Sequence, residues 1–115
     1  MKLYGIPNCD TVKKARNWLT ENGIAYEWHD FKKQGLSEEH VAQWLTQIEW
    51  EQLINKQGTT WRKLDDTTKA SVIDAASATD VMLANPSVIK RPVLVTGNST
   101  NVGFKPELYQ ALLSS

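Results

Sequence analysis

Apolar residues in the first third of the chain alternate between strand and helix spacing. Residues 2–6 predict a short strand that Pro7 closes, and residues 24–31 predict a second strand rich in aromatic side chains. Between them, residues 10–22 form a helical pattern whose buried face is Val12, Ala15, Trp18 and Leu19. The opening is therefore a strand–helix–strand unit with two parallel strands and a right-handed crossover.

The middle of the chain shows helical spacing only. After a loop at residues 32–35, Ser37 is expected to cap a helix that carries apolar residues as far as Ile48. Further short helices are predicted over residues 50–54, from Thr59 or Thr60 to residue 64, and over residues 67–76 and 78–84, with Val72 and Ile73 facing inward. Asp65-Asp66 is interpreted as a turn or cap, because adjacent carboxylates on a helix point apart.

The end of the chain returns to strand patterns. Val93-Leu94-Val95 is a strand, Gly97-Asn98 is a hairpin turn signal, and residues 101–104 are the returning strand. Pro106 suits the first turn of a last helix. The whole pattern indicates an α/β fold in which a mixed four-stranded sheet, in the order βαβ…ββα, is covered by helices. We expect one domain over residues 1–115, with an all-helical insertion at about residues 36–86.

Composition narrows the functional classes. The 115 residues carry 13 basic and 13 acidic side chains, so no overall field points to nucleic acid or to an anionic membrane. The five tryptophans are spread along the chain without a basic cluster, which indicates packing and not base stacking. No apolar run is long enough to span a bilayer, and residues 1–5 lack a signal-peptide segment, so we expect a soluble cytoplasmic protein.

Cys9 is the one residue whose chemistry is conspicuous. It is the only cysteine, so no internal disulfide can form, and with only two histidines present we expect no metal site. Cys9 follows the first strand and directly precedes the first helix, where unpaired N–H groups and the helix dipole favour a thiolate. The alternative is that Cys9 is a small buried packing residue.

Two arginines are candidate partners. Arg91-Pro92 comes just before the predicted strand at residues 93–95, and Arg62 lies in the Thr60-Trp61-Arg62-Lys63-Leu64 segment. Taken alone, each is better explained as an exposed surface charge.

Three segments in order resemble a known family. The run from Asn8 to Leu19, the Thr60–Leu64 segment and Ile89-Lys90-Arg91-Pro92-Val93 are similar to the glutathione- and glutaredoxin-linked arsenate reductase (ArsC) family. The similarity covers essentially the whole chain and is greatest to the small bacterial branch of YffB-type proteins and Spx/MgsR-type regulators. It implies a thioredoxin-like fold with a helical insertion and a cis bond at Pro92.

The resemblance also implies roles for individual residues. Cys9 matches the nucleophile that attacks the oxyanion in arsenate reductases, and Arg62 and Arg91 match anion-binding arginines. We expect the remaining substrate contacts from Asn8, Thr11, Pro92 and Lys105. Lys105 takes the place of a third arginine and keeps the charge but not the bidentate fork, which argues against arsenate as the natural substrate.

The regulator branch differs at one position. Its members often carry a Cys-x-x-Cys switch, whereas this chain has Val12 at the second position. We therefore expect a glutathione-dependent monothiol reductase that acts on a small oxyanion or a disulfide. Glutathione would be the co-substrate and glutaredoxin a candidate partner. We expect no bound cofactor and a monomeric protein. The alternatives are a non-enzymatic Spx-like regulator that binds RNA polymerase, and a family member that binds an anion without catalysis.

Overall fold

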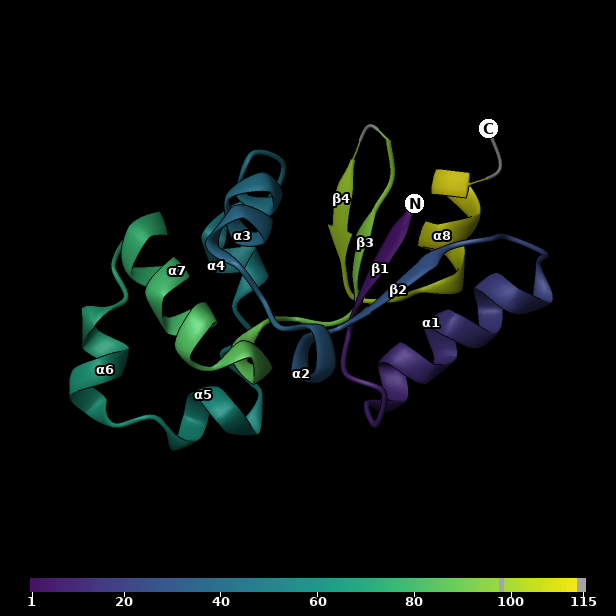
Figure 1. Ribbon diagram of the computed structural model, residues 1–115. Coiled ribbons are helices and arrows are strands. Elements are labelled where there is room, and N and C mark those ends of the chain that lie inside the picture. Colours follow the sequence, from purple (N-terminus) through teal and green to yellow (C-terminus); the bar gives the residue numbers. More distant parts are fainter. Residues whose placement is uncertain (98, 114–115) are drawn as a thin grey trace. The chain divides into compact units, whose positions relative to one another are not determined.

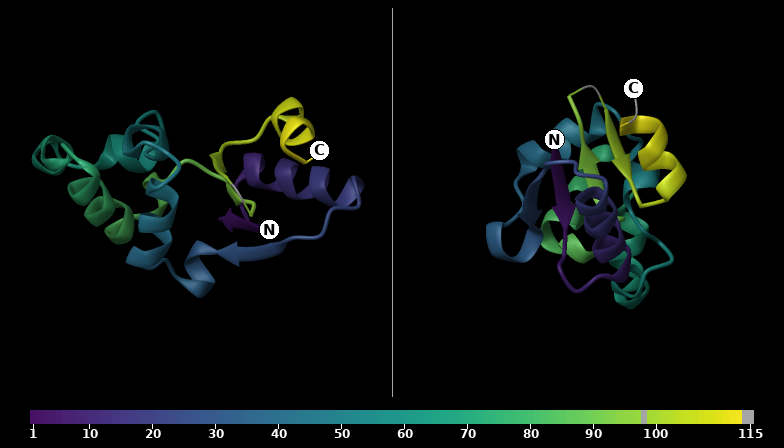
Figure 2. Two further views of the ribbon diagram at one scale, coloured as in Figure 1. Left: turned by 90° about the horizontal axis from the view of Figure 1, so that it is seen from above. Right: turned by 90° about the vertical axis from the view of Figure 1, so that its right-hand side faces the viewer.

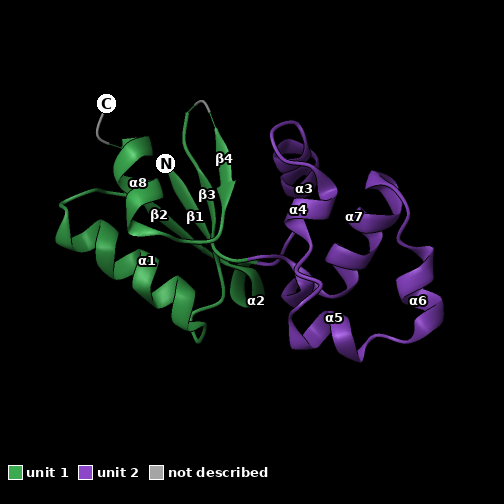
Figure 3. Cartoon of the chain, turned by 180° about the vertical axis from the view of Figure 1, so that it is seen from behind, with its two compact units in different colours: residues 1–34, 91–115 green, residues 35–90 purple. Residues whose placement is uncertain are grey.

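A computed structural model describes residues 1–97 and 99–113 of the protein. The chain forms two compact units, one of residues 1–34 and 91–115 and the other of residues 35–90 (Figure 3). We call them unit 1 and unit 2. The predictions of a single domain and of insertion boundaries at about 36 and 86 stay predictions.

Unit 1 is built on a mixed four-stranded sheet, as the sequence predicts. Its strands are β1 (Lys2–Gly5), β2 (Glu27–Asp30), β3 (Val93–Val95) and β4 (Thr100–Val102), in the spatial order β2-β1-β3-β4 (Figure 1). β1 runs parallel to β2, with Leu3 opposite Trp28, and antiparallel to β3, with Leu3 opposite Leu94. β3 and β4 pair in an antiparallel hairpin. Asn98, in the predicted turn, lies outside the described residues.

Two helices lie on one face of this sheet, α1 (Asp10–Glu21) and α8 (Pro106–Leu113) (Figure 2). Their contact is a core in which every member is fully buried: Leu3, Ala15, Leu19, Leu94 and Tyr109. Leu3 pairs with Leu94, and both side chains are on the helix side, so this core packs α1 and α8 against β1 and β3.

Both ends of α1 follow local rules. Cys9 is the N-cap, with extended backbone angles of φ −92° and ψ 127°, and Val12, Ala15 and Leu19 form the buried face. At the other end Asn22 is the C-cap, and Gly23 adopts a positive φ of 68°, as the sequence predicts for a glycine stop.

The second strand is shorter than the sequence predicts, and the predicted loop at residues 32–35 is wrong. β2 ends at Asp30, and Phe31 starts the short helix α2 (Phe31–Gln34). The physical reason is the buried Asp30 carboxylate, whose Oδ1 accepts hydrogen bonds from the N–H groups of Lys32 at 2.8 Å and Lys33 at 3.3 Å. This cap converts the expected loop into a helical turn.

Unit 2 is helical. Its elements are α3 (Glu38–Leu45), α4 (Trp50–Leu53), α5 (Thr59–Lys63), α6 (Asp66–Ser71), α7 (Ala75–Ala84) and the 3₁₀ turn η1 (Pro86–Val88). Ser37 caps α3 and Asp65 caps α6, both as predicted. Ile54 and Ile89 form one isolated antiparallel bridge.

The helix predicted over residues 67–76 is present, but its predicted end at residue 76 is wrong. α6 ends at Ser71, and Asp74 starts α7 by accepting a hydrogen bond from the N–H of Ser77 at 2.9 Å. Because this cap separates the two helices, only Val72 is buried, and Ile73 is 74% exposed instead of facing inward. The tryptophans behave as expected: Trp44 and Trp61 are buried, and Trp18, Trp28 and Trp50 are half-buried.

Candidate functional site around Cys9

Cys9 sits in the turn that joins β1 to α1. Its N–H donates to the carbonyl of Ile6 at 3.3 Å, and its carbonyl accepts the first α-helical hydrogen bond from Lys13 at 2.9 Å. The side chain is half-buried and carries a free thiol. The sulfur is therefore fixed at the N-terminus of α1 without being closed off in the core, so the alternative of a fully buried packing residue is wrong.

The surroundings of the thiol act on its pKa in opposite directions. Partial burial raises the pKa of Cys9. The pKa is lowered by the N–H of Val12, by a hydrogen bond and the positive charge from Arg91, and by the N–H of Thr11. Together these groups bring the pKa of Cys9 below that of an ordinary cysteine. The sulfur makes no capping hydrogen bond of regular geometry. We therefore regard the two N–H groups as dipoles directed toward a developing thiolate.

Arg91 reaches the thiol from the segment just before β3. The Arg91-Pro92 bond is cis, as the family resemblance implied, and Pro92 is buried. Its carbonyl accepts a hydrogen bond from Gly103 at 2.9 Å, which ties the segment to the residues that follow β4. β3 lies next to β1 and runs antiparallel to it, so the start of β3 and the end of β1 lie at the same end of the sheet. This topology brings Arg91 to Cys9.

The other predicted residues occupy different places. Asn8 and Thr11 are exposed and flank Cys9 in the chain. Lys105 is also exposed, just before α8, where its carbonyl accepts from the N–H of Tyr109 at 3.1 Å, and it is not among the groups that set the Cys9 pKa. Arg62 is exposed on α5 and belongs to unit 2, so its part in the site stays a prediction.

From the sequence, Val12 was expected to be a core residue and to stand where a Cys-x-x-Cys motif would have its second cysteine. The structure adds a further role, because the backbone N–H of Val12 faces the sulfur. The sequence could have indicated this role, because the second and third residues after an N-cap, here Thr11 and Val12, have N–H groups that are unpaired within the helix.

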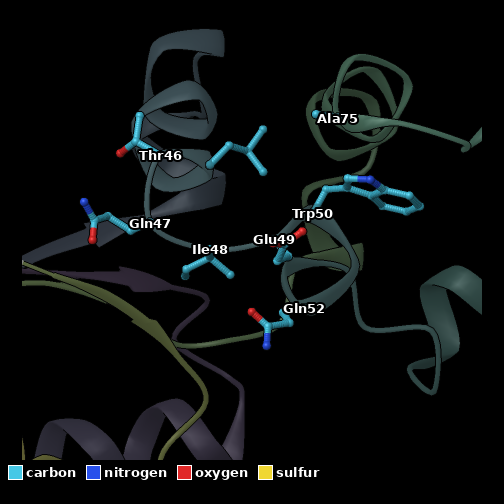
Figure 4. Close-up of a pocket in the computed structure, with 8 residues that line it drawn as sticks. Thr46, Gln47, Ile48, Glu49, Trp50, Gln52 and Ala75 are labelled. Carbon is cyan, nitrogen blue, oxygen red and sulfur yellow. The ribbon is translucent and has the colours of Figure 1, made fainter.

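Unit 2 has a hollow of its own, of about 290 Å³, between the end of α3, α4 and the start of α7. Figure 4 shows Gln47, Ile48, Trp50 and Ala75 at this hollow. None of the predicted site residues lines it. Within the described residues, no group of three or more His, Cys, Asp or Glu side chains is arranged to hold a metal ion, and no helix is long and apolar enough to cross a membrane.

Two solved structures are similar over nearly the whole chain. A protein named YFFB is 52% identical, with 97% of each chain covered and a TM-score of 0.93. An arsenate reductase (ArsC) related protein from Brucella melitensis is 50% identical, covers 99% of this chain and 94% of its own, and has a TM-score of 0.76. Together with the mixed sheet, these matches show a thioredoxin-like fold of the arsenate reductase type.

Sequence comparison with curated proteins finds two kinds of relative. An uncharacterized protein of Haemophilus influenzae is 43% identical over 109 residues, which is 95% of each chain. The global transcriptional regulator Spx of Streptococcus pyogenes is 28% identical over 115 residues, covering 97% of this chain and 84% of the regulator. The sequence profile of the ArsC family matches residues 4–112. The chain therefore belongs to the ArsC family.

Proposed function

We propose that the protein is a glutathione-dependent monothiol reductase in which Cys9 is the nucleophile. The observation that carries this proposal is the Cys9 thiol itself, half-buried at a helix N-terminus, with Arg91 beside it and a lowered pKa. A lowered pKa raises the fraction of thiolate at neutral pH, and the thiolate is the attacking form.

With a disulfide substrate, the Cys9 thiolate attacks one sulfur. The S–S electron pair leaves with the other sulfur, which takes up a proton as a free thiol, and Cys9 is left in a mixed disulfide. A glutathione thiolate then attacks that mixed disulfide, and a second glutathione completes the exchange. The net reaction is one disulfide and two glutathione molecules going to two thiols and one glutathione disulfide.

With an oxyanion substrate, the thiolate would bond to the central atom and displace a hydroxyl group as water. Attack by glutathione on the Cys9 sulfur would then leave two electrons on the central atom and a Cys9–glutathione disulfide. In this proposal Arg91 stabilises the adduct, and Arg62, Lys105, Asn8, Thr11 and Pro92 complete the anion pocket. Lys105 supplies charge without a bidentate fork, which makes a tightly held tetrahedral oxyanion a poorer substrate than a disulfide.

The need for an outside thiol follows from the composition of the chain. Cys9 is the only cysteine, and Val12 stands where a Cys-x-x-Cys motif would place its second thiol. No internal thiol can release a mixed disulfide, so a thiol from another molecule must do so. We propose glutathione in that role, in the cytoplasm, with a monomeric protein and with glutaredoxin as an optional partner.

The test is glutathione-dependent reduction of a small disulfide by wild-type protein and by Cys9→Ser. Oxidation of glutathione, followed with glutathione reductase and NADPH, should depend on the protein and be lost in the variant. Turnover that survives in Cys9→Ser would remove Cys9 from the mechanism. Absence of turnover in the wild type, with oxyanion binding retained, would identify a family member that binds an anion without catalysis.

A second candidate is a regulator that binds RNA polymerase without catalysis. The observation in its favour is the 28% identity to Spx over 97% of this chain. The absence of a second cysteine argues against a dithiol switch but leaves a redox-independent contact open. Purified polymerase captured equally by wild-type protein and Cys9→Ser would support this candidate, and no capture at micromolar concentrations would contradict it.

A further inference from the structure

Arg16, on α1, is held in place by Trp28 of β2 and by Tyr26, which comes just before this strand. Its guanidinium carbon lies 4.3 Å from the centroid of the Trp28 ring, and its Nε donates a hydrogen bond to the hydroxyl of Tyr26 at 3.1 Å. The side chain is half-buried. Stacking on one ring and a hydrogen bond to another fix the direction of the guanidinium, so little conformational entropy remains to be lost on binding.

This fixed guanidinium has no acidic partner in residues 1–97 and 99–113. The ion pair that the structure describes is between Lys2 and Glu27, and Arg16 uses only Nε in its hydrogen bond to Tyr26. Its two terminal nitrogens, which form the planar fork that suits a carboxylate, donate to no described group. A half-buried, oriented arginine with an unused fork is a ready receptor for a carboxylate.

The position of Arg16 relates this receptor to Cys9. Arg16 is seven positions after Cys9, the N-cap of α1, so its place on the helix is roughly 10 Å along the axis from the Cys9 end. Helical side chains lean toward the N-terminus, which is the Cys9 end. The Trp28 ring also extends toward that end. Its Cη2 atom would lie 3.5 Å from a Cβ placed on Gly5, and the same Cβ would lie 2.9 Å from Cγ2 of Val12, a residue within one helical turn of Cys9.

We propose that Arg16 binds a carboxylate of the thiol that reacts at Cys9. This inference rests on the proposed function and deepens it, because it identifies the co-substrate as a thiol with a carboxylate several bonds from its sulfur. Glutathione carries its thiol on the central residue of a tripeptide and a carboxylate on each outer residue, so either carboxylate can extend away from Cys9 along α1 when the sulfur is at Cys9. Arg16 is a binding residue that positions the thiol and takes no part in bond making.

The experiment measures how fast different thiols attack Cys9 after it has been converted to a mixed disulfide with 2-thiopyridine, a neutral leaving group. The attacking thiolate forms a bond to the Cys9 sulfur, and the electron pair of the broken S–S bond leaves with the thiopyridine, whose absorbance reports the rate. Glutathione is compared with 2-mercaptoethanol, which has no carboxylate. Each thiol is compared with itself across variants, so differences in thiol basicity cancel.

The variants are Arg16→Met, Arg16→Lys and the control Lys14→Met, which removes the same charge from an exposed position on the same helix. Arg16→Met should slow glutathione about 5-fold, the size expected for one charge-assisted hydrogen-bonded pair, and leave 2-mercaptoethanol within about twofold. Arg16→Lys should be intermediate, and Lys14→Met should change neither rate. Equal slowing of both thiols by Arg16→Met, or no slowing of glutathione, would overturn the inference.

A second measurement needs no variant and no reaction at Cys9. S-methylglutathione, which cannot exchange, is titrated into ¹⁵N-labelled wild-type protein while the Arg16 Nε–H resonance is followed. We expect a saturable shift that the diethyl ester of the same ligand, which lacks free carboxylates, does not produce. No shift at about 10 mM ligand, or the same shift with the ester, would overturn the assignment. If all thiols fail to release thiopyridine from the wild type, the proposed function fails, and this titration still decides the role of Arg16.

Discussion

Arg91 donates a hydrogen bond to the sulfur of Cys9 and places its positive charge beside it, although the two residues come from distant parts of the sequence. The antiparallel pairing of β1 with β3 makes this contact possible. Cys9 follows the end of β1 and Arg91 precedes the start of β3, and these two strand ends lie at the same end of the sheet. The same relationship assigns Arg91 a defined physical task, which is to favour the thiolate over the thiol.

Replacing Arg91 with methionine should raise the pKa of Cys9. The variant loses a hydrogen bond to the sulfur and a nearby positive charge, and it keeps a side chain of similar length. Alkylation by iodoacetamide should therefore slow at neutral pH and recover at alkaline pH, where the thiol is ionised in both proteins. Arg91→Lys, the matched control, should lie between the two. Slowing that persists unchanged at alkaline pH would instead indicate that Arg91 controls access to the sulfur.

The lowered pKa of Cys9 also predicts how stability depends on pH. A thiol whose pKa is lower in the folded than in the unfolded state stabilises the fold as thiolate. This contribution is complete above the unfolded pKa of about 8.5 and is lost as the pH falls through the folded pKa. The difference in free energy of unfolding between reduced wild type and Cys9→Ser should therefore grow in favour of the wild type as the pH is raised through the folded pKa to about pH 9, as measured by urea denaturation. A constant difference would contradict the pKa shift.

Gly5 should not tolerate a side chain. A Cβ at this position would lie 2.9 Å from Cγ2 of Val12, closer than such atoms approach in proteins, and both residues are fully enclosed between β1 and α1. Gly5→Ala should lower the free energy of unfolding by about 1–3 kcal/mol, the usual cost of overpacking. Gly97→Ala is the control, since a Cβ there meets nothing within 4 Å. Equal stability of the Gly5 and Gly97 variants would show that α1 can move away from β1 at little cost.

Tyr109 should be replaceable by phenylalanine without loss of stability. Its side chain is 0% exposed, and its hydroxyl has no hydrogen-bond partner among the described residues. Burial raises the pKa of this hydroxyl far above its ordinary value. Removing an unpaired buried hydroxyl removes a desolvation cost of about 1–3 kcal/mol and keeps the edge-to-face contacts of the ring with Trp18 and Phe104. Thermal unfolding should show a Tyr109→Phe midpoint at or above that of the wild type. A clearly lower midpoint would reveal a hydrogen bond to the hydroxyl, through water or otherwise.

The fold could be predicted largely because its signals are local. Helical spacing of Val12, Ala15 and Leu19, the glycine stop at Gly23 and the β-branched run at residues 93–95 each act over a few residues, and each element appears where they place it. The errors came from side-chain caps that interrupt a pattern. Asp30 converts the predicted loop into α2, and the cap formed by Asp74 and Ser77 moves the break between two predicted helices from residue 77 to residues 72–74.

The candidate site could be predicted only in part. The position of Cys9 at a helix start is a local property, and the structure places it there. Its contact with Arg91 depends on strand order, which spacing alone does not reveal, and it was expected only through the family resemblance. The stack of Arg16 on Trp28 was not predicted, because a cation and an aromatic residue twelve positions apart carry no pattern until α1 packs on the sheet.

The central claim is that the surroundings of Cys9 make it a reactive thiolate. It is tested most directly by the pH dependence of Cys9 alkylation in the reduced wild-type protein, with the modified residue identified by mass spectrometry. We predict a single ionisation with a pKa below that of free cysteine, about 8.5, and a substantial rate at neutral pH. A pKa at or above the free-cysteine value would contradict the role of the α1 N-terminus and Arg91, and with it the proposal that Cys9 is a nucleophile.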